Sequence, residues 1–553
     1  MSGQRTPMPG ALPGTPRAPR ALPGTPGALP GTPGVLPAAL TGTSAEAVNE
    51  AVTEVLIVGG GLVGLTAALV CRHHGLEVTV VEKRTTTSPQ PKARRFHVRS
   101  MEIFRELGLA QMVHEAARDL AGHDRMAAGR TLAEAGLLPL WRPSGPGGPE
   151  VELSPEPPCL IAQDTLEPVL REAAVAAGAT VRFGTELTAF EQRWETGEVV
   201  ATLLDRTDGR RERLRCLHLV AADGARSTVR EALGIGRSGR GPVGEPSVSV
   251  YFRADLGDVV RGREFNLCQI DHPDAPGALA SVDGRRRWVF MTGGDTADRD
   301  WPRVLRTALG VPAPDLEVLS ALPWRAEMLV ADRYTHHRVH LAGDAAHVMP
   351  PFAASGANTG IADAHNLGWK LAAVLRGRAA PALLDSYDAE RRPAGWFAAD
   401  QSSRRTQALR DRATAPDPTL AHPYVLAAGG FQYTEGALVP GPADLADPEP
   451  VTEFRPAGRV GTRVPHRWLD ERRTRSTLDL AGPGWALVAG PSVRVPDRLT
   501  TPGPYATDLP VHRIEADFLP PDHLLLLRPD QVVAWRGTDP ATATSALAGL
   551  LAG

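Results

Sequence analysis

Apolar and polar positions follow two different patterns along this chain. Short, mainly apolar runs are typical of strands buried on both faces of a parallel sheet, and they occur at 55–58, 78–81, 217–222 and 339–342. Residues 248–256 alternate instead, as a half-buried strand does, and an amphipathic helix is expected from Ile361 to about Leu375. These patterns predict a parallel α/β sheet together with a second, separate sheet.

The first apolar run leads directly into a glycine-rich turn. Gly59, Gly61 and Gly64 form a G-x-G-x-x-G pattern, and residues 65–74 read as a helix closed by Gly75. In such a turn the first glycine permits the tight bend, the second lets the backbone approach a pyrophosphate, and the third lets the helix pack closely on the strand. The phosphate then lies on the free N–H groups at the start of the helix.

An acid ends the second strand. Glu82 stands where an acid accepts hydrogen bonds from both ribose hydroxyls and repels a 2′-phosphate. Strand, glycines, helix, strand and acid therefore predict a dinucleotide site. A second G-x-G-x-x-G at 234–239 follows a helix-like segment and runs into Arg240-Gly241-Pro242, so we interpret it as a loop. No second fingerprint indicates a separate nicotinamide domain.

Two acidic motifs follow the later apolar runs. Asp223-Gly224 comes after the run at 217–222 and is followed by Arg230, and Gly343-Asp344 comes after the run at 339–342. Through these ordered motifs, over roughly residues 53 to 400, the chain resembles the class A flavoprotein monooxygenases, the single-component aromatic hydroxylases. It is most similar to the actinomycete members that hydroxylate polyketides in antibiotic biosynthesis. The resemblance implies one FAD, bound non-covalently.

The resemblance also implies roles for individual residues. Asp223 and Gly224 serve both FAD and NAD(P)H, Arg230 helps to place the nicotinamide, and Asp344 holds the ribityl 3′-hydroxyl. The helix start at Gly356 faces the isoalloxazine, where free N–H groups stabilise negative charge on reduced flavin. The predicted cofactor-binding residues are Gly59, Gly61, Leu62, Val63, Gly64, Glu82, Lys83, Arg99, Gln163, Asp223, Gly224, Gly343, Asp344, Pro351, Gly356, Ala357 and Asn358.

Two further segments carry the resemblance, with two departures. Arg99 matches an arginine near the FAD phosphates or ribityl chain, and Gln163 matches a glutamine directed toward the cofactor. Lys92 replaces a more usual arginine and loses its planar fork. Ala353 and Ala354 stand where many relatives have a glycine pair, which bears on how the flavin moves.

Some side chains keep two interpretations. Asp223 either binds the cofactor or only caps its helix, and His347 is expected to pack against the strand edge rather than to act in catalysis. Core packing is likewise the expectation for four aromatic side chains between the acidic motifs, although a β-sheet there forms the substrate cavity in the family. They are Phe252, Trp288, Phe290 and Trp324. No catalytic base is identified.

The predicted fold is α/β: a Rossmann-like FAD-binding domain with an inserted β-sheet substrate domain and a C-terminal thioredoxin-like domain. The expected segments are a disordered Pro/Gly-rich tail (1–50), the first part of the FAD-binding domain (51–245), the substrate domain (246–325), the rest of the FAD-binding domain (326–400), a helix and linker (401–454) and the C-terminal domain (455–553). The C-terminal domain contains no cysteine, so it carries no dithiol chemistry.

The composition of the chain indicates which classes of binding partner are expected. Sixty Lys+Arg against 63 Asp+Glu give a formal net charge of −3, which favours neither nucleic acid nor an anionic membrane. The four cysteines include no C-x-x-C pair, so we expect no metal site, no disulfide framework and a cytoplasmic location. A monomer or a homodimer is expected.

The function implied by the resemblance is hydroxylation of an aromatic, polyketide-type natural product. NAD(P)H would reduce FAD, and oxygen from O₂ would reach the substrate through a flavin C4a-hydroperoxide. An alternative of a different class stays open, because some relatives hold FAD without redox turnover and catalyse a cyclisation or rearrangement.

Overall fold

A computed structural model describes residues 51–139, 152–294, 299–410, 417, 419–446 and 456–553. The predicted disordered tail, 1–50, lies outside the described residues, as does part of the predicted linker.

The largest sheet has eight strands, and its central strands run parallel. Its order is β18-β19-β10-β1-β2-β7, with β8 and β9 continuing antiparallel from β10. The strands are β1 (Ala51–Val58), β2 (Val78–Glu82), β7 (Thr180–Phe183), β8 (Thr185–Arg193), β9 (Glu198–Asp205), β10 (Arg211–Ala221), β18 (Thr335–His336) and β19 (Val339–Leu341). The mainly apolar runs in the sequence are therefore the core strands of this sheet.

The register of the parallel strands brings the three motifs together. Val58 at the end of β1 pairs with Ala221 at the end of β10, and Ala221 pairs with Leu341 at the end of β19. The glycine turn, the Asp223-Gly224 motif and the Gly343-Asp344 motif each begin one or two residues later. All three therefore leave the same carboxyl edge of the sheet, where ligands of open α/β sheets bind.

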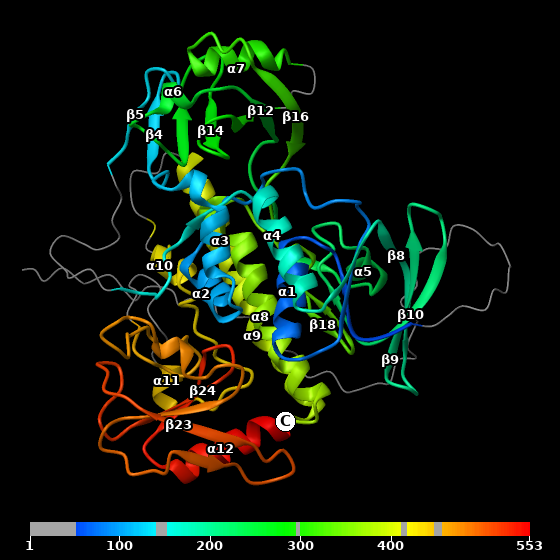
Figure 1. Cartoon of the computed structure of the whole chain (residues 1–553), viewed down its shortest axis with the longest axis vertical. Coiled ribbons are helices and arrows are strands. Elements are labelled where there is room, and N and C mark those ends of the chain that lie inside the picture. The colour runs from blue at the N-terminus through cyan, green and yellow to red at the C-terminus, as the bar shows by residue number, and fades with distance from the viewer. Residues whose placement is uncertain (1–50, 140–151, 295–298, 411–416, 418, 447–455) are drawn as a thin grey trace, which may run out of the picture. The chain divides into compact units, whose positions relative to one another are not determined.

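Helices cover the large sheet. Helix α1 (Leu62–His73) packs against α4 (Gln163–Ala176) and the long α8 (Ser355–Leu375), and α8 packs in turn against α9 (Asp385–Arg410). These central helices are visible together in Figure 1. The shorter helices of this region are α2 (Val98–Glu106), α3 (Ala110–Ala116) and α5 (Thr228–Ala232). Strand and helix side chains share one apolar core.

A second sheet, mostly antiparallel, has the order β16-β12-β15-β14-β13-β4-β5. Its strands are β4 (Met126–Gly129), β5 (Gly136–Leu137), β12 (Ser247–Arg253), β13 (Leu267–Ile270), β14 (Gly277–Ser281), β15 (Arg287–Gly293) and β16 (Glu317–Trp324), accompanied by α6 (Gly257–Val260) and α7 (Trp301–Leu309). In Figure 1 α7 lies across the end of this sheet near β12 and β16. Strands β4 and β5 fall within the range predicted for the FAD-binding domain, yet they join this sheet through β13.

Two small sheets connect these parts. One consists of β11 (Arg237–Pro242), β17 (Glu327–Ala331) and β20 (His347–Val348), and the other of β3 (Arg95–Phe96) and β6 (Cys159–Leu160). The second glycine pattern has no strand–turn–helix context, as expected, because α5 precedes it. It is not wholly a loop, since Gly239 lies within β11.

The C-terminal residues form a five-stranded sheet of order β22-β23-β21-β24-β25, followed by α12 (Pro540–Ala552). The strands are β21 (Ala486–Ala489), β22 (Arg498–Thr500), β23 (Asp508–Arg513), β24 (Leu524–Leu527) and β25 (Val533–Gly537), and α10 (Pro423–Ala427) and α11 (Pro442–Ala446) precede them. Alternate residues of β24 enter two different apolar clusters, so both faces of the sheet are covered. Trp369 of α8 stacks edge-on with Trp485 at 5.7 Å and joins one of these clusters.

None of the helices in the described part of the chain is long and apolar enough to cross a membrane.

Candidate functional site

The glycine turn depends on missing side chains at two positions and leaves the third open. Gly59 has φ +113°, and a Cβ there would lie 2.2 Å from the Ala222 carbonyl oxygen. A Cβ on Gly64 would lie 1.9 Å from the Gly59 carbonyl oxygen, so this glycine permits the close approach of α1 to the strand. A Cβ on Gly61 would meet only Glu167 Oε1, at 3.5 Å. The protein itself therefore does not need a glycine at position 61, which fits a role toward a ligand.

Glu82 is joined to this turn by hydrogen bonds. Its carboxylate accepts from the backbone N–H of Gly60 (2.9 Å) and from that of Arg84 (2.9 Å). The acid predicted for the ribose therefore lies directly under the glycine turn, while Lys83 beside it is exposed. Leu62 is buried at the start of α1, and Val63 is half-buried against Gly343.

Glu167 is a second acid beside the glycine turn, and sequence reasoning did not single it out. It is 2% exposed, and its carboxylate accepts from the Gln163 side-chain amide (2.7 Å) and from the Ser88 N–H (2.7 Å). Desolvation raises the pKa of its carboxyl despite these donors. Gln163, predicted to face the cofactor, accepts from Ala93 N–H at 3.1 Å and thus joins α4 to residues 88–93. The sequence did offer a signal for Glu167: it stands four residues after Gln163, and side chains at that spacing meet on one face of a helix.

The Asp223-Gly224 motif is built around the start of α5. Asp223 Oδ2 accepts from the Val229 N–H (3.2 Å), and its Oδ1 is buried with no hydrogen-bond partner in the part that the structure describes. Asp223 therefore caps its helix and still has an acceptor to spare. Arg230 is 2% exposed, and its guanidinium donates to the carbonyls of Ala225 (3.3 Å) and Ala345 (3.2 Å). It connects the two acidic motifs, and its role toward NAD(P)H stays a prediction.

The Gly343-Asp344 turn requires its glycine. Gly343 has φ +61°, and a Cβ there would lie 2.8 Å from the Val63 side chain. Asp344 is exposed, but protein surrounds its carboxyl closely enough that desolvation raises its pKa despite the nearby His347 and Lys92. An exposed carboxylate thus stands beside the start of α1, where the predicted ribityl chain would run.

Helix α8 begins without a side-chain cap; the Ser355 N–H donates to the Phe352 carbonyl, and the N–H groups of the next residues are left for a ligand. Asn358 does not point its amide outward: it accepts from the His97 N–H (2.8 Å) and Ser100 Oγ (2.7 Å) and donates to the carbonyls of Arg95 (3.1 Å) and Ala354 (2.7 Å). It fastens the helix start to the segment before α2. Of the neighbouring predicted residues, Pro351 is exposed and Gly356 and Ala357 are half-buried.

Arg99 has partners far along the chain. Its guanidinium donates to the Asp530 carbonyl at 2.9 Å, to the Gln531 side chain and to Glu102 at 3.2 Å. Its contact with the FAD phosphates stays a prediction; its partners in the structure lie in α2, in α8 (His365 Nδ1, 3.4 Å) and in the C-terminal segment. Glu102, 1% exposed, also pairs with Arg463. Contacts across more than 300 residues leave no local signal in the sequence.

Comparisons with known proteins agree with this architecture. Residues 52–402 match the family model for an FAD binding domain, and residues 457–552 match the one for an aromatic-ring hydroxylase C-terminal domain. The tetracenomycin A2 monooxygenase-dioxygenase of Streptomyces glaucescens is 39% identical over 87% of this chain and 93% of its own. The tetracenomycin B2 monooxygenase-dioxygenase of Streptomyces olivaceus is 38% identical over 87% of this chain and 94% of its own.

A solved ternary complex of aklavinone-11 hydroxylase with FAD and aklavinone superimposes with a TM-score of 0.77 and 31% identity, covering 91% of this chain and 99% of that one. The chain belongs to the FAD-dependent aromatic hydroxylases. It is a flavoprotein monooxygenase, as its motifs predict, and the residues gathered at the sheet edge fit the cofactor. The open position at Gly61, the uncapped start of α8 and the spare acceptor of Asp223 are the features that carry this fit.

In this aromatic hydroxylase the second sheet has two unlike faces. Phe252, Trp288 and Phe290 are fully buried in its own core, so core packing was the correct expectation for these three aromatics. Trp324 is half-buried on the other face and donates to Ser249 Oγ at 2.8 Å. The other face also carries Tyr251, which clusters with Ala162 just before α4 and so faces the FAD-binding part.

A polar group interrupts this second, largely apolar face. Asp164 Oδ2 accepts from Arg287 Nη1 at 2.9 Å and from the Tyr251 hydroxyl at 3.5 Å, while its Oδ1 is buried without a hydrogen-bond partner among the described residues. Desolvation raises the pKa values of both Asp164 and Tyr251. Asp164 directly follows the predicted cofactor residue Gln163, and this adjacency was the signal for it in the sequence.

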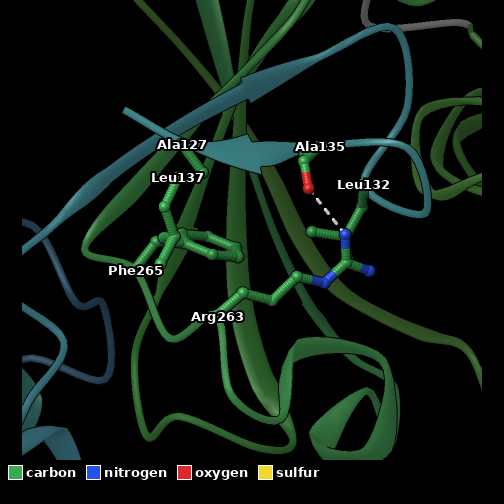
Figure 2. Close-up of a pocket in the computed structure, with 6 residues that line it drawn as sticks. All are labelled: Ala127, Leu132, Ala135, Leu137, Arg263 and Phe265. Atoms are coloured by element: carbon green, nitrogen blue, oxygen red, sulfur yellow. Dashed lines mark hydrogen bonds between the residues drawn. The ribbon is translucent and has the colours of Figure 1, made fainter. Parts of the chain in front are cut away.

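The second sheet also contains a small recess on its β4–β5 side. Figure 2 shows Arg263 reaching into it, and its Nη1 donates to the Ala135 carbonyl at 2.6 Å. No part of it admits a water molecule, so it is too small to hold a substrate. No group of His, Cys, Asp or Glu among the described residues is arranged to hold a metal ion.

Proposed function

We propose that this enzyme hydroxylates an electron-rich, polycyclic aromatic natural product of the polyketide type, using NAD(P)H and O₂. The observation that carries the proposal is the meeting of the glycine turn, both acidic motifs and the start of α8 at one sheet edge. It is supported by relatives, similar over nearly their whole length, that are named for the oxygenation of tetracenomycins and the hydroxylation of aklavinone.

Protein groups at the sheet edge bind and orient the cofactor. The N–H groups around Gly61 take the pyrophosphate, Glu82 takes the ribose, and Asp344 takes the ribityl chain. Bound FAD supplies the transfer of oxygen from O₂ to the ring. The N–H groups at the start of α8 stabilise negative charge on the ring system that faces them.

The face of the second sheet that carries Tyr251 and Val289 forms the substrate surface in this proposal. A flat aromatic gains affinity from apolar area, and a few polar groups set its orientation. Asp164 and its partners Tyr251 and Arg287 are the polar groups in position to do so. Residues 246–325 then act as the substrate domain, and residues 455–553, with their five-stranded sheet, as a thioredoxin-like structural domain.

The nicotinamide is proposed to dock transiently beside the Asp223-Gly224 turn, because the sequence has no second dinucleotide fingerprint. Arg230 contributes by holding the Ala225 carbonyl and thereby the shape of that turn. The enzyme is proposed to act in the cytoplasm as a monomer or homodimer. No catalytic base is assigned, since bound flavin carries the oxygen transfer.

The test uses the FAD-loaded enzyme with aklavinone as the probe substrate. We expect NADPH to bleach the flavin absorption band near 450 nm, and ¹⁸O₂ to place one labelled oxygen in the product. Strict anaerobiosis without NADPH should give no product. Full-rate formation of an isomer of the substrate under those conditions would replace the hydroxylase by the cyclase or rearrangement alternative. Tetracenomycin A2 serves as a second probe if aklavinone does not bind.

A further inference from the structure

Asp363 is a fully buried carboxylate on α8, two turns after the start of that helix. Three donors converge on it: the Gly343 N–H at 3.1 Å, His347 Nε2 at 2.7 Å and Arg391 Nε at 2.8 Å. We refer to Gly343, His347, Asp363 and Arg391 as the loop cluster. Gly343, which contributes its backbone N–H to this cluster, immediately precedes Asp344, the predicted ribityl anchor.

The Asp363 carboxylate keeps its charge despite burial. Desolvation alone would raise the pKa of Asp363, but His347, Arg391 and the Gly343 N–H together hold it below its ordinary value. Burying an ion pair rarely adds net stability compared with apolar packing. Overall stability is therefore a weak reason for a carboxylate here, and the geometry that it imposes on the turn is a stronger one.

The turn at Gly343 is held from several sides. A Cβ on Gly360 of α8 would lie 3.0 Å from Gly343 Cα, which shows how closely the helix approaches the turn. Val63 of α1 approaches from the direction in which a Gly343 side chain would point. With the Asp363 hydrogen bond, these contacts set the backbone from which Asp344 projects. A binding group held in place before the ligand arrives loses less entropy on binding.

The loop cluster also reaches the C-terminal part of the chain. Arg391 donates to the Tyr433 hydroxyl (2.8 Å) and to the Thr359 carbonyl (3.1 Å). The Tyr433 N–H donates to the Gly461 carbonyl at 2.9 Å, within the region matched by the ring-hydroxylase C-terminal family. A chain of hydrogen bonds thus leads from the C-terminal region to the turn that carries Asp344.

We propose that Asp363 is a positioning residue for the cofactor. It holds the Gly343 N–H and so aims Asp344 at the FAD, and Arg391 and Tyr433 make this arrangement depend on the C-terminal region. The proposal rests on the proposed placement of Asp344 beside the ribityl chain.

The first experiment compares Asp363→Asn with Asn366→Leu. Asn366 lies on the same helix and is as deeply buried, but it donates to Glu390 (2.7 Å) and Asp530 (3.1 Å) rather than to the turn. Apoprotein is titrated with FAD by flavin fluorescence, and the thermal midpoint of each apoprotein is measured in parallel. We expect Asp363→Asn to raise the FAD dissociation constant about tenfold to a hundredfold, the value of one charged hydrogen bond. Asn366→Leu should lower the thermal midpoint and leave the dissociation constant within about twofold, the usual scatter of such a fit.

A lowered thermal midpoint with an unchanged FAD affinity in Asp363→Asn would overturn the proposal. Asp344→Ala separates this result from a failure of the site itself: if that variant also binds FAD normally, the placement of Asp344 is wrong. If Asp363→Asn does not fold, two variants at His347 decide. His347→Leu removes a donor and should weaken FAD binding, whereas His347→Gln restores an N–H donor and should recover it. Equal affinities in these two variants would likewise overturn the proposal.

The link to the C-terminal region has its own test. Tyr433→Phe removes only the hydroxyl that receives Arg391. We expect a several-fold weaker FAD affinity, corresponding to about 1 kcal/mol for one ordinary hydrogen bond. An affinity equal to that of the wild type would remove the C-terminal region from the proposal.

Discussion

Helices α8 and α9 share two buried ionic clusters, built from similar groups and turned toward different parts of the protein. In the loop cluster, Asp363 of α8 meets Arg391 of α9. In the second, which we call the C-terminal cluster, Lys370 of α8 meets Glu390 of α9 at 2.8 Å, and Glu390 receives both Nη groups of Arg528 at 2.8 Å. Neighbouring residues of one helix, 390 and 391, therefore serve different clusters.

The difference lies in what each cluster holds. In the loop cluster the Asp363 carboxylate accepts from the Gly343 N–H at the cofactor turn, whereas the C-terminal cluster binds Arg528 and, through it, Asp530. Its opposite charges hold the pKa of Glu390 at about 2, and desolvation lowers that of Lys370 to about 8. We infer that the C-terminal cluster governs attachment of the C-terminal sheet, while the loop cluster governs the shape of the site.

The largest effect is expected from Gly61→Val, which removes the cofactor and leaves both clusters intact. The apoprotein has room for a side chain at this position, since the nearest atom to an added Cβ is 3.5 Å away. The branched side chain would occupy the space that a pyrophosphate needs, so we expect colourless protein. Absorbance at 450 nm after purification measures this. A yellow variant with full FAD occupancy would contradict the assignment of the glycine turn.

The next largest effect is expected from Glu390→Gln, which breaks the C-terminal cluster alone. Lys370 and Arg528 are fully buried, and they would lose the carboxylate that balances them. Breaking a buried pair by removing one partner costs about 3–5 kcal/mol. Urea unfolding of the apoprotein should show a loss of that size, with the FAD affinity of the folded fraction reduced by no more than in Tyr433→Phe. An equal effect on FAD affinity would show that the two clusters act as one.

A pair of buried histidines differs from both ionic clusters, because none of the carboxylates that the structure describes is hydrogen-bonded to it. His218 of β10 and His340 of β19 lie 3.0 Å apart between Nδ1 and Nε2, and Thr335 Oγ1 is 3.1 Å from His340 Nδ1. Burial lowers the pKa of His340 to about 3 and that of His218 well below its ordinary value. The unfolded chain therefore binds more protons than the folded protein below about pH 6.5.

The free energy of unfolding should therefore decrease as the pH is lowered below about 6.5, by about 1.4 kcal/mol per pH unit for each of the two histidines. We expect His340→Gln to show a shallower loss between about pH 6.5 and 5 in urea unfolding experiments. Thr335→Val, which removes a contact of His340 but no histidine, is the matched control and should keep the wild-type slope. Identical slopes in all three proteins would exclude the buried pair as the source of acid sensitivity.

The smallest effect is expected from Ala354→Gly, just before α8. Ala354 has φ +54°, a left-handed conformation that costs a non-glycine residue about 1–2 kcal/mol. Because glycine loses more entropy on folding, we expect a net gain of about 1 kcal/mol at most. Ala362→Gly, within α8, should instead lose about 1 kcal/mol. A destabilised Ala354→Gly variant would show that the methyl group contributes more than the strain removes.

Ala354 also shows how a departure from the family pattern acquires a physical meaning. In the sequence it stood where many relatives have glycine. The structure shows the backbone conformation for which glycine is suited, and the Ala354 carbonyl accepts from the Asn358 side chain at 2.7 Å. The motif pattern identified the position, but the backbone angle comes from the contacts that hold the start of α8.

Local patterns in the sequence were sufficient for the mainly parallel sheet, the glycine turn and the two acidic motifs. Strand burial, helix starts and glycine turns depend on residues within a few positions of one another, so their spacing can be read directly. The register of β1, β10 and β19 then brings the motifs to one edge, because parallel strands end on the same side. This is why Glu82 lies beneath the glycine turn, hydrogen-bonded to Gly60 at 2.9 Å.

Only the tertiary structure determined which charged side chains pair. Arg99 belongs to a motif expected at the cofactor, yet it reaches the Asp530 carbonyl, 431 residues away. Asp363 read as one polar residue in an amphipathic helix, and its partners Gly343 and Arg391 come from a turn and another helix. A charged residue is equally compatible with many partners in sequence. Burial selects among them, because a charge removed from water is stable only where packing supplies its hydrogen bonds.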